Sequence, residues 1–228
     1  MGFWQMFHVE QSQERLLRKH LEWVLNTTRI HNLTAIIDAD EAWRLHVIDS
    51  LAALSGVDEA PPGPLLDIGT GGGFPGVPLA VMSGRETVCL DSVKKKIQVL
   101  KEFLRSDAGY HNIRTCDQRA EERAIDEPNA YAVVTTRAVS QLNSIVELAA
   151  PLLMEGGICI CLKGNVTPEE IAAGDAAAHR CGLERKQIRN YTLPGGHEAR
   201  CIVEYLKVAE PEITLPRRTG VAQKRPLQ

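Results

Sequence analysis

Short apolar runs alternate with segments of helical periodicity along most of the chain. Five runs, at residues 65–69, 87–91, 113–116, 131–135 and 157–162, have the length and composition of buried strands. Helices are indicated after the first, second, fourth and fifth runs, the last opened by the capping sequence Thr167-Pro168-Glu169-Glu170. Two further strands, near 183–193 and 199–207, flank Pro194-Gly195-Gly196 and predict an antiparallel hairpin. This order favours a parallel sheet with helices on both faces and an antiparallel edge.

The first 64 residues do not show this alternation of strands and helices, because their pattern predicts helices alone. Leu17 and Leu21 recur at helical spacing in a helix over 12–25, which Ser12 would cap. A second helix, beginning at residues 38–40, would carry further apolar side chains to the core. The segment 58–64 is rich in Pro and Gly, and it divides an N-terminal helical extension (residues 1–64) from a main domain (residues 65–228).

Composition argues against several classes of protein. The 228-residue chain has 44% hydrophobic and 24% charged residues, which are ordinary globular values, and no apolar run approaches the ~20 residues of a membrane span. Its first ten residues lack the basic and apolar regions of a signal peptide. The six cysteines are scattered without a C-x-x-C pair, which favours buried free thiols. We therefore expect a cytoplasmic protein without a membrane span or a metal site.

The net charge of −3 does not indicate nucleic-acid binding, but the charge is unevenly distributed. Residues 180–228 carry a net charge of +5, and the last 16 residues contain four cations and no acid: Arg217, Arg218, Lys224 and Arg225. Such a tail fits a phosphate-binding role, and it equally fits a solvated C-terminus.

A glycine-rich turn follows the first strand, in the sequence Leu65-Leu66-Asp67-Ile68-Gly69-Thr70-Gly71-Gly72-Gly73-Phe74-Pro75-Gly76. A strand, a glycine-rich turn and a helix start form the point at which α/β folds bind nucleotide-like ligands. The spacing of Gly69, Gly71 and Gly73 is typical of methyltransferases, whereas that of Gly71, Gly73 and Gly76 also matches the dinucleotide fingerprint.

The order of elements decides between these two interpretations. Five strand–helix units closed by a hairpin are the architecture of class I methyltransferases, which use S-adenosylmethionine. A dinucleotide dehydrogenase normally needs a further substrate domain, and little sequence remains for one. We therefore predict a class I α/β methyltransferase fold with a seven-stranded, mostly parallel sheet.

Two acids are candidates for the cofactor site. Asp91 ends the second strand 18 residues after Gly73, where a carboxylate can accept hydrogen bonds from ribose hydroxyls; the alternative is a turn-capping acid. Asp67 lies at the carboxyl end of the first strand, where it would either brace the turn or meet the ammonium group of the ligand.

The residues after the later strands suggest the rest of the site. Glu121, in Arg119-Ala120-Glu121, could reach an adenine edge or simply begin an exposed helix. Arg137 and Lys163 follow the fourth and fifth strands and would face the acceptor as phosphate- or base-binding cations, unless each pairs with a surface acid.

The motifs that are missing also indicate the reaction. The fourth strand is followed by Thr135-Thr136-Arg137-Ala138 rather than by the Asn/Asp-Pro-Pro-aromatic motif of exocyclic-amine methyltransferases. The one Thr-Cys pair, Thr115-Cys116, lies on the adenosine side, away from where a cysteine nucleophile for a pyrimidine carbon would be needed. Guanine N7 attacks a methyl group directly and needs no base, so we assign no catalytic residue.

These segments together resemble the RsmG (GidB) family of bacterial small-subunit ribosomal RNA guanine-N7 methyltransferases. The most specific matches are the continuation Gly73-Phe74-Pro75-Gly76 and the helix His46-Val47-Ile48-Asp49-Ser50-Leu51. Further matches are Asn32-Leu33-Thr34, Leu90-Asp91-Ser92, Arg119-Ala120-Glu121, Arg137-Ala138-Val139, Lys163-Gly164 and Pro216-Arg217-Arg218.

The resemblance implies that Gly69, Phe74, Ala120, Glu121 and Arg137 contact S-adenosylmethionine. The acceptor would be a guanine N7 of 16S ribosomal RNA, either free or in a small-subunit particle, and the enzyme would act as a monomer. Candidate RNA contacts are Arg137, Lys163, Arg200, Arg217 and Arg218. Two alternatives stay open: a methyltransferase acting on a small molecule or a protein, and a non-catalytic protein that binds S-adenosylmethionine during ribosome assembly.

Overall fold

The computed structural model describes residues 9–137 and 139–228. Residues 1–8, on which most of the signal-peptide expectation rests, and Ala138, in the motif after the fourth strand, lie outside the described residues.

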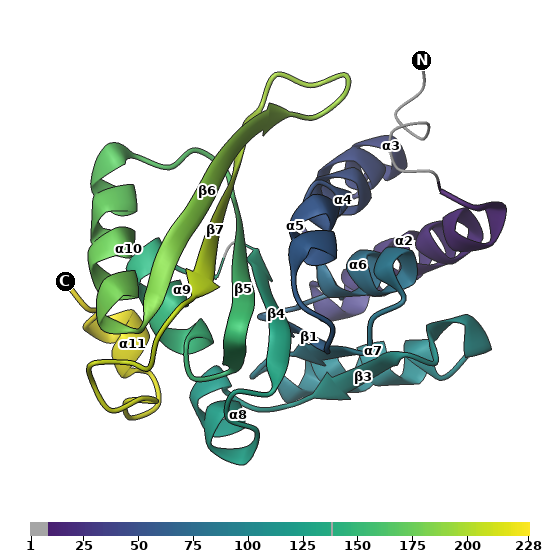
Figure 1. Cartoon of the computed structure of the whole chain (residues 1–228). Helices are drawn as coiled ribbons and strands as arrows, with labels where there is room; N and C mark the ends of the chain where they lie inside the picture. The colour runs from purple at the N-terminus through teal and green to yellow at the C-terminus, as the bar shows by residue number, and fades with distance from the viewer. Residues whose placement is uncertain (1–8, 138) are drawn as a thin grey trace.

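The described chain folds around one seven-stranded sheet with the order β3-β2-β1-β4-β5-β7-β6 (Figure 1). Five strands are parallel: β1 (Leu65–Ile68), β2 (Thr87–Leu90), β3 (Ile113–Cys116), β4 (Tyr131–Arg137) and β5 (Leu153–Lys163). The hairpin strand β7 (Ala199–Lys207) runs antiparallel to β5, and β6 (Leu183–Thr192) runs antiparallel to β7. The predicted fold class and the antiparallel hairpin are therefore confirmed.

Helices cover both faces of the sheet because the strands are buried on both sides. One face packs against α8 (Ala120–Asp126), α9 (Leu142–Ala149) and α10 (Pro168–Arg180), and the short α11 (Val221–Lys224) packs on α9. The other face packs against the N-terminal helices, α6 (Gly76–Ser83) and α7 (Lys94–Leu104); the short η2 (Ala108–Tyr110) leads from α7 into β3. Alternate residues serve the two layers: Leu66 and Ile68 face the first, and Leu65 faces the second.

The first helix, α2 (Gln11–His31), is longer than the helix expected over 12–25, and its cap is different. The N-cap is Glu10 rather than Ser12, because the Glu10 amide donates to Gln13 Oε1 at 3.0 Å in a reciprocal capping arrangement. The helix continues to Asn32, whose left-handed backbone (φ 49°) ends it while its amide bonds the Thr28 carbonyl.

The second predicted helix is interrupted. It is replaced by α3 (Ala39–Ala42), the π-helical η1 (Trp43–Ile48), α4 (Asp49–Leu51) and α5 (Leu54–Glu59). Wide π turns insert a residue into a helix and are frequent at functional sites. Here the wide turn carries His46.

The N-terminal helices share their core with the sheet. Leu17 and Val24 of α2 are fully buried in the same cluster as Phe74 and Ile160. The division at residue 64 stays a prediction about chain organisation. In the described residues, no helix is long and apolar enough to cross a bilayer.

Candidate functional site

The glycine-rich turn joins β1 to α6 at the carboxyl edge of the sheet. Gly69, Gly71 and Gly73 have φ of 74°, 56° and 97°, a region that favours glycine. A Cβ at Gly71 would meet nothing nearer than the Gly69 carbonyl oxygen at 4.0 Å, so this part of the turn faces open space. A Cβ at Gly73 would lie 2.8 Å from His20 Nε2. The turn thus offers bare backbone to a ligand on one side and packs tightly on the other.

Asp67 holds this turn in place through hydrogen bonds. Its side chain is fully buried, its Oδ2 accepts the Gly76 amide at 2.9 Å, and its Oδ1 accepts the Thr135 hydroxyl at 3.3 Å. Burial raises the pKa of Asp67 to about 6, and its hydrogen bonds oppose that rise. Of the two roles expected for Asp67, these contacts correspond to bracing; a contact with the ligand ammonium stays a prediction.

Asp91 ties the end of β2 to the turn. Its Oδ2 accepts the Gly71 amide at 3.0 Å, and its Oδ1 accepts the Val93 amide at 2.9 Å. The same carboxylate lines a small hollow of about 70 Å³ together with Gly69, Ala120 and Glu121. Four sequence-predicted cofactor residues therefore meet around one cavity, and the bare turn and carboxylates beside it fit a nucleoside.

The C-terminal tail closes the far side of this hollow. Its Gly220 amide donates to Glu121 Oε1 at 2.7 Å, and Gln223 lines the hollow. The Ser144 hydroxyl donates to the Ala222 carbonyl at 2.8 Å, which holds the tail against α9.

Arg217 and Arg218 lie in different surroundings, although both were predicted to contact RNA. The Arg217 guanidinium forms a bidentate ion pair with Glu147, at 2.6 and 2.5 Å, and the Glu147 side chain is only 2% exposed. Arg218 is exposed and has no ion pair within the described residues. An RNA contact by either residue stays a prediction.

Phe74 lies between two imidazoles. Its ring centroid is 4.6 Å from that of His20 and 4.9 Å from that of His46, and the Arg137 guanidinium lies 5.3 Å from the ring centre. Phe74 is 5% exposed, so in this conformation it is mainly a packing residue that positions its neighbours. Its contact with the cofactor stays a prediction.

Both imidazoles are neutral. Burial lowers the pKa of His20 to about 4, so its Nε2–H donates to the Gly72 carbonyl, 2.8 Å away, and leaves Nδ1 without a partner among the described residues. Burial, with a smaller effect from the Arg137 charge, lowers the pKa of His46 to about 3. The Arg137 guanidinium can only donate hydrogen bonds, so His46 Nδ1 accepts one from Arg137 Nη2 at 3.2 Å. The proton of His46 is therefore on Nε2, which donates to Thr34 Oγ1 at 2.7 Å.

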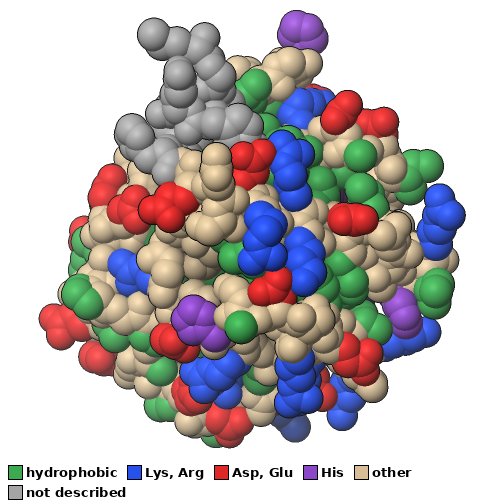
Figure 2. Space-filling model, turned by 90° about the vertical axis from the view of Figure 1, so that its right-hand side faces the viewer, with side chains coloured by type: hydrophobic (Ala, Val, Ile, Leu, Met, Phe, Trp, Pro, Cys, Tyr) green, Lys and Arg blue, Asp and Glu red, His purple; other side chains and the backbone are tan. Residues whose placement is uncertain are grey.

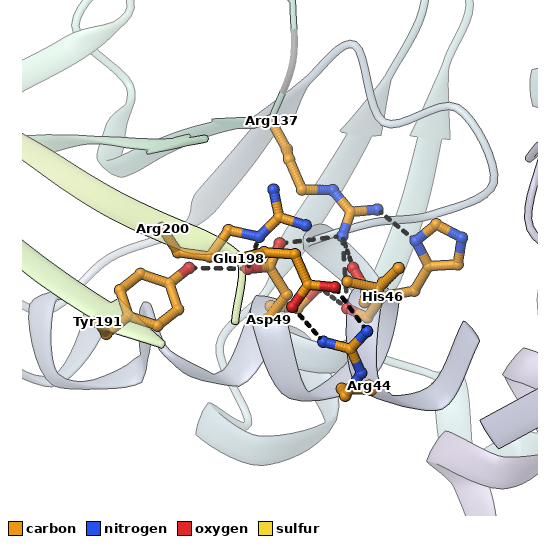
Figure 3. A network of polar contacts seen from close by, with 9 residues as sticks. Arg44, His46, Asp49, Arg137, Tyr191, Glu198 and Arg200 are labelled. Atoms are coloured by element: carbon orange, nitrogen blue, oxygen red, sulfur yellow. Dashed lines mark hydrogen bonds and ion pairs between the residues drawn. The ribbon is translucent and has the colours of Figure 1, made fainter. Parts of the chain in front are cut away.

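Arg137, the last residue of β4, is the centre of a polar network (Figure 3). Its Nη1 donates to the Leu45 carbonyl at 3.0 Å and lies 3.5 Å from Asp49 Oδ2. Asp49 Oδ1 accepts the Tyr191 hydroxyl at 2.8 Å and lies 3.5 Å from Arg200 Nε. The network joins the N-terminal helices to β4 and to the β6–β7 hairpin.

A second bridge in Figure 3 links the same two regions. Arg44 of η1 forms a bidentate pair with Glu198, just before β7, at 2.6 and 2.7 Å. Bidentate geometry fixes the relative orientation of the elements better than a single contact does. The hairpin and the helices around His46 therefore form one wall.

A pocket of about 440 Å³ opens beside this wall, at the carboxyl ends of β4 and β5. Arg137, Lys163 and Arg200 all line it, so the structure brings these three predicted RNA contacts together. Lys163 Nζ lies 2.8 Å from both the Ser140 carbonyl and Glu170 Oε1. Each cation is therefore held by an acid of the pocket wall, either Asp49 or Glu170.

Three residues of this site have no role assigned from local sequence. His20 follows no motif, and nothing in its neighbourhood along the chain indicates a contact with the turn. His46 and Asp49 belong to the helix that resembles the family, and this resemblance is the signal that the sequence offers for them. In the described residues, no group of three His, Cys, Asp or Glu side chains could hold a metal ion.

This chain is similar to known proteins over most of its length. The model of the GidB family, described as rRNA small subunit methyltransferase G, matches residues 13–198. A ribosomal RNA small subunit methyltransferase G from Carboxydothermus hydrogenoformans is 34% identical over 96% of this chain and 94% of its own length. Its counterpart from Nostoc punctiforme is 37% identical over 95% of this chain and 91% of its own length.

Solved methyltransferases share the fold at low sequence identity. Geranyl diphosphate methyltransferase, solved with GPP and sinefungin, gives a TM-score of 0.57 at 13% identity and covers 75% of this chain and 80% of its own. A methyltransferase from Galdieria sulphuraria, described as acting on sarcosine and dimethylglycine, gives 0.54 at 13% identity and covers 76% and 89%. With the family match, they confirm the predicted fold class and S-adenosylmethionine as its cofactor. The chain therefore belongs to the GidB family, rRNA small subunit methyltransferase G.

Proposed function

We propose that this protein transfers the methyl group of S-adenosylmethionine to N7 of a guanine in 16S ribosomal RNA. The family match over residues 13–198 supports the reaction and the RNA substrate. The observation that carries the proposal is structural: Phe74, which continues the glycine-rich turn, lies 5.3 Å from the guanidinium of Arg137, and Arg137 lines the charged pocket of about 440 Å³. A cofactor site and an acceptor site of a methyltransferase must adjoin in this way.

On the cofactor side, we assign the turn glycines, Asp91 and Glu121 to S-adenosylmethionine. Each carboxylate oxygen of Asp91 accepts one backbone amide and keeps a lone pair for a ribose hydroxyl. Ala120 and Glu121 flank the hollow where the adenine would lie. Asp67 would act through the turn, because its carboxylate is buried beneath it.

On the acceptor side, the pocket suits one nucleotide. Three cations, Arg137, Lys163 and Arg200, face two carboxylates, Asp49 and Glu170, which leaves an excess of one positive charge. A phosphate group would compensate that excess, and the carboxylates can accept hydrogen bonds from the N–H groups of a guanine.

The chemistry needs no proton to be removed before methyl transfer. When bound, S-adenosylmethionine supplies a methyl group on a positively charged sulfur. Guanine N7 carries a free lone pair, so the protein's task is to orient the base and to accommodate the positive charge that the product carries. Asp49 and Glu170 put negative charge near that position, and neutral His46 adds no competing cation.

Such a reaction on ribosomal RNA belongs in the cytoplasm. We propose that the enzyme works there as a monomer, with both sites formed by one chain.

The test is methyl transfer from labelled S-adenosylmethionine to purified 16S RNA and to small-subunit particles. The proposal expects label in 7-methylguanosine, and an Asp91→Ala variant should transfer less. Label in a protein or a small molecule would favour another acceptor. Binding of S-adenosylmethionine without any transfer would favour a non-catalytic assembly factor.

A further inference from the structure

Six cations in residues 94–117 lack the ion pairs that hold most other cations of this chain. They are Lys94, Lys95, Lys96, Lys101, Arg105 and Arg114. None has an acidic partner within 4.0 Å among the described residues, whereas the arginines and Lys163 around the acceptor pocket all do. These cations lie at the surface without an acidic partner, so they are free to meet an anion.

Four residues at helical spacing define a strip along α7: Lys94, Gln98, Lys101 and Arg105. All four are exposed and line one shallow hollow of about 460 Å³. Lys101 and Arg105 also line the adjacent hollow of about 530 Å³, with Arg114 of the edge strand β3 on its other side. We call these five residues the α7–β3 strip.

The acids nearby do not cancel this charge. Asp107 is already bound by Arg15 at 3.1 Å and by Lys19 at 2.9 Å. The Gly109 amide and these two cations hold its pKa well below the usual range, so it stays a paired carboxylate at neutral pH. Within residues 94–117, Glu102 and Asp117 are then the acids left to balance the charge of the six cations. Figure 2 shows Lys and Arg side chains from the middle to the lower edge of one face of the molecule, with acids between them.

The position of the strip relates it to the site. It begins at Lys94, three residues after Asp91, and follows α7 away from the carboxyl edge of the sheet. At 1.5 Å per residue, Lys94 and Arg105 are about 16 Å apart. When one nucleotide of an RNA occupies the acceptor pocket, the nucleotides that flank it can lie along the strip from Lys94 to Arg105. The negative charge elsewhere on the chain would repel other orientations.

We propose that the α7–β3 strip binds phosphates of the ribosomal RNA flanking the methylated nucleotide. The inference rests on the proposed function, and it assigns the main phosphate contacts to α7 and β3 rather than to the C-terminal tail. The strip makes sequence-independent contacts, so it sets how the RNA lies and leaves the choice of base to the acceptor pocket.

The test compares two triple variants in RNA binding at several salt concentrations. One is Lys101→Ala/Arg105→Ala/Arg114→Ala; the other is Arg218→Ala/Lys224→Ala/Arg225→Ala, which removes the exposed tail cations. Each lost phosphate contact lowers the salt slope by about 0.7–0.9, so the strip variant should lose about 2 from its slope. The wild type would then lose roughly 20-fold more affinity than this variant between 50 and 200 mM salt.

Affinity for S-adenosylmethionine should stay unchanged in the strip variant, which shows that the fold is intact. An unchanged salt slope in the strip variant would overturn the proposal, and so would a larger loss of slope in the tail variant than in the strip variant. The proposal would also be overturned if the strip variant bound small-subunit particles more weakly than the wild type but bound free RNA equally well. That result would favour an acidic protein as the partner of the strip. Methyl transfer by the wild type is measured separately, so failure of the proposed function is distinguishable from failure of the strip.

Discussion

Replacing Arg217 with alanine should release the C-terminal tail and destabilise the protein. The change removes the bidentate partner of Glu147, whose side chain is 2% exposed, and leaves that carboxylate buried without its cation. Removing one partner of a fully buried pair costs about 3–5 kcal/mol. The Arg217 side chain is 28% exposed, so water can partly replace it, and we expect about 2–4 kcal/mol.

Urea unfolding of Arg217→Ala and Arg218→Ala gives a matched comparison, because the two residues are adjacent and only the first is paired. Arg218→Ala should change the free energy of unfolding by no more than about 0.5 kcal/mol. The tail also closes the hollow beside Glu121 through Gly220, so Arg217→Ala alone should weaken binding of S-adenosylmethionine. Equal unfolding free energies for the two variants would refute this account of the tail.

Three further predictions concern the cofactor side. Asp91→Ala should weaken binding of S-adenosylmethionine by about 1–3 kcal/mol, measured by calorimetry, with Asp117→Ala as an exposed control; equal affinities would remove Asp91 from the site. Gly73→Ala should abolish binding of S-adenosylmethionine, because the added Cβ would lie 2.8 Å from His20 Nε2. Gly84→Ala is the control, because Gly84 also has a positive φ but a Cβ there would meet nothing within 4 Å; this variant should bind S-adenosylmethionine normally. His20 has its pKa lowered to about 4 in the fold, so the unfolded chain takes up a proton first as the pH falls below 6.5. The wild type should therefore lose about 1 kcal/mol more stability than His20→Asn between pH 6.5 and 5.5, and equal losses would contradict a buried neutral His20.

The sheet could be predicted from the sequence because its signals are local. Strands β1 and β2 are buried along their whole length and so appear as apolar runs, and Gly69, Gly71 and Gly73 of the turn have positive φ. The hairpin and α10 could also be predicted from local sequence. At the start of α10, Thr167 Oγ1 accepts a hydrogen bond from the Glu170 amide at 3.2 Å, as the capping sequence predicts.

The partners of the site residues could not be predicted because they come from distant segments. Arg137 meets the N-terminal helix carrying His46, and His20 reaches the turn 52 residues further on. Such contacts depend on how helices pack across the sheet, which local periodicity does not encode. The same limit applies to the tail: its run of cations indicated phosphate binding, yet Arg217 meets a buried acid 70 residues away.

The central claim is tested most directly by identifying the methylated nucleoside. Small-subunit particles that lack the modification are incubated with the enzyme and labelled S-adenosylmethionine, and the 16S RNA is digested to nucleosides and separated. The account predicts that the label is recovered as 7-methylguanosine. Label in any other nucleoside, or none in the RNA despite bound cofactor, would contradict it.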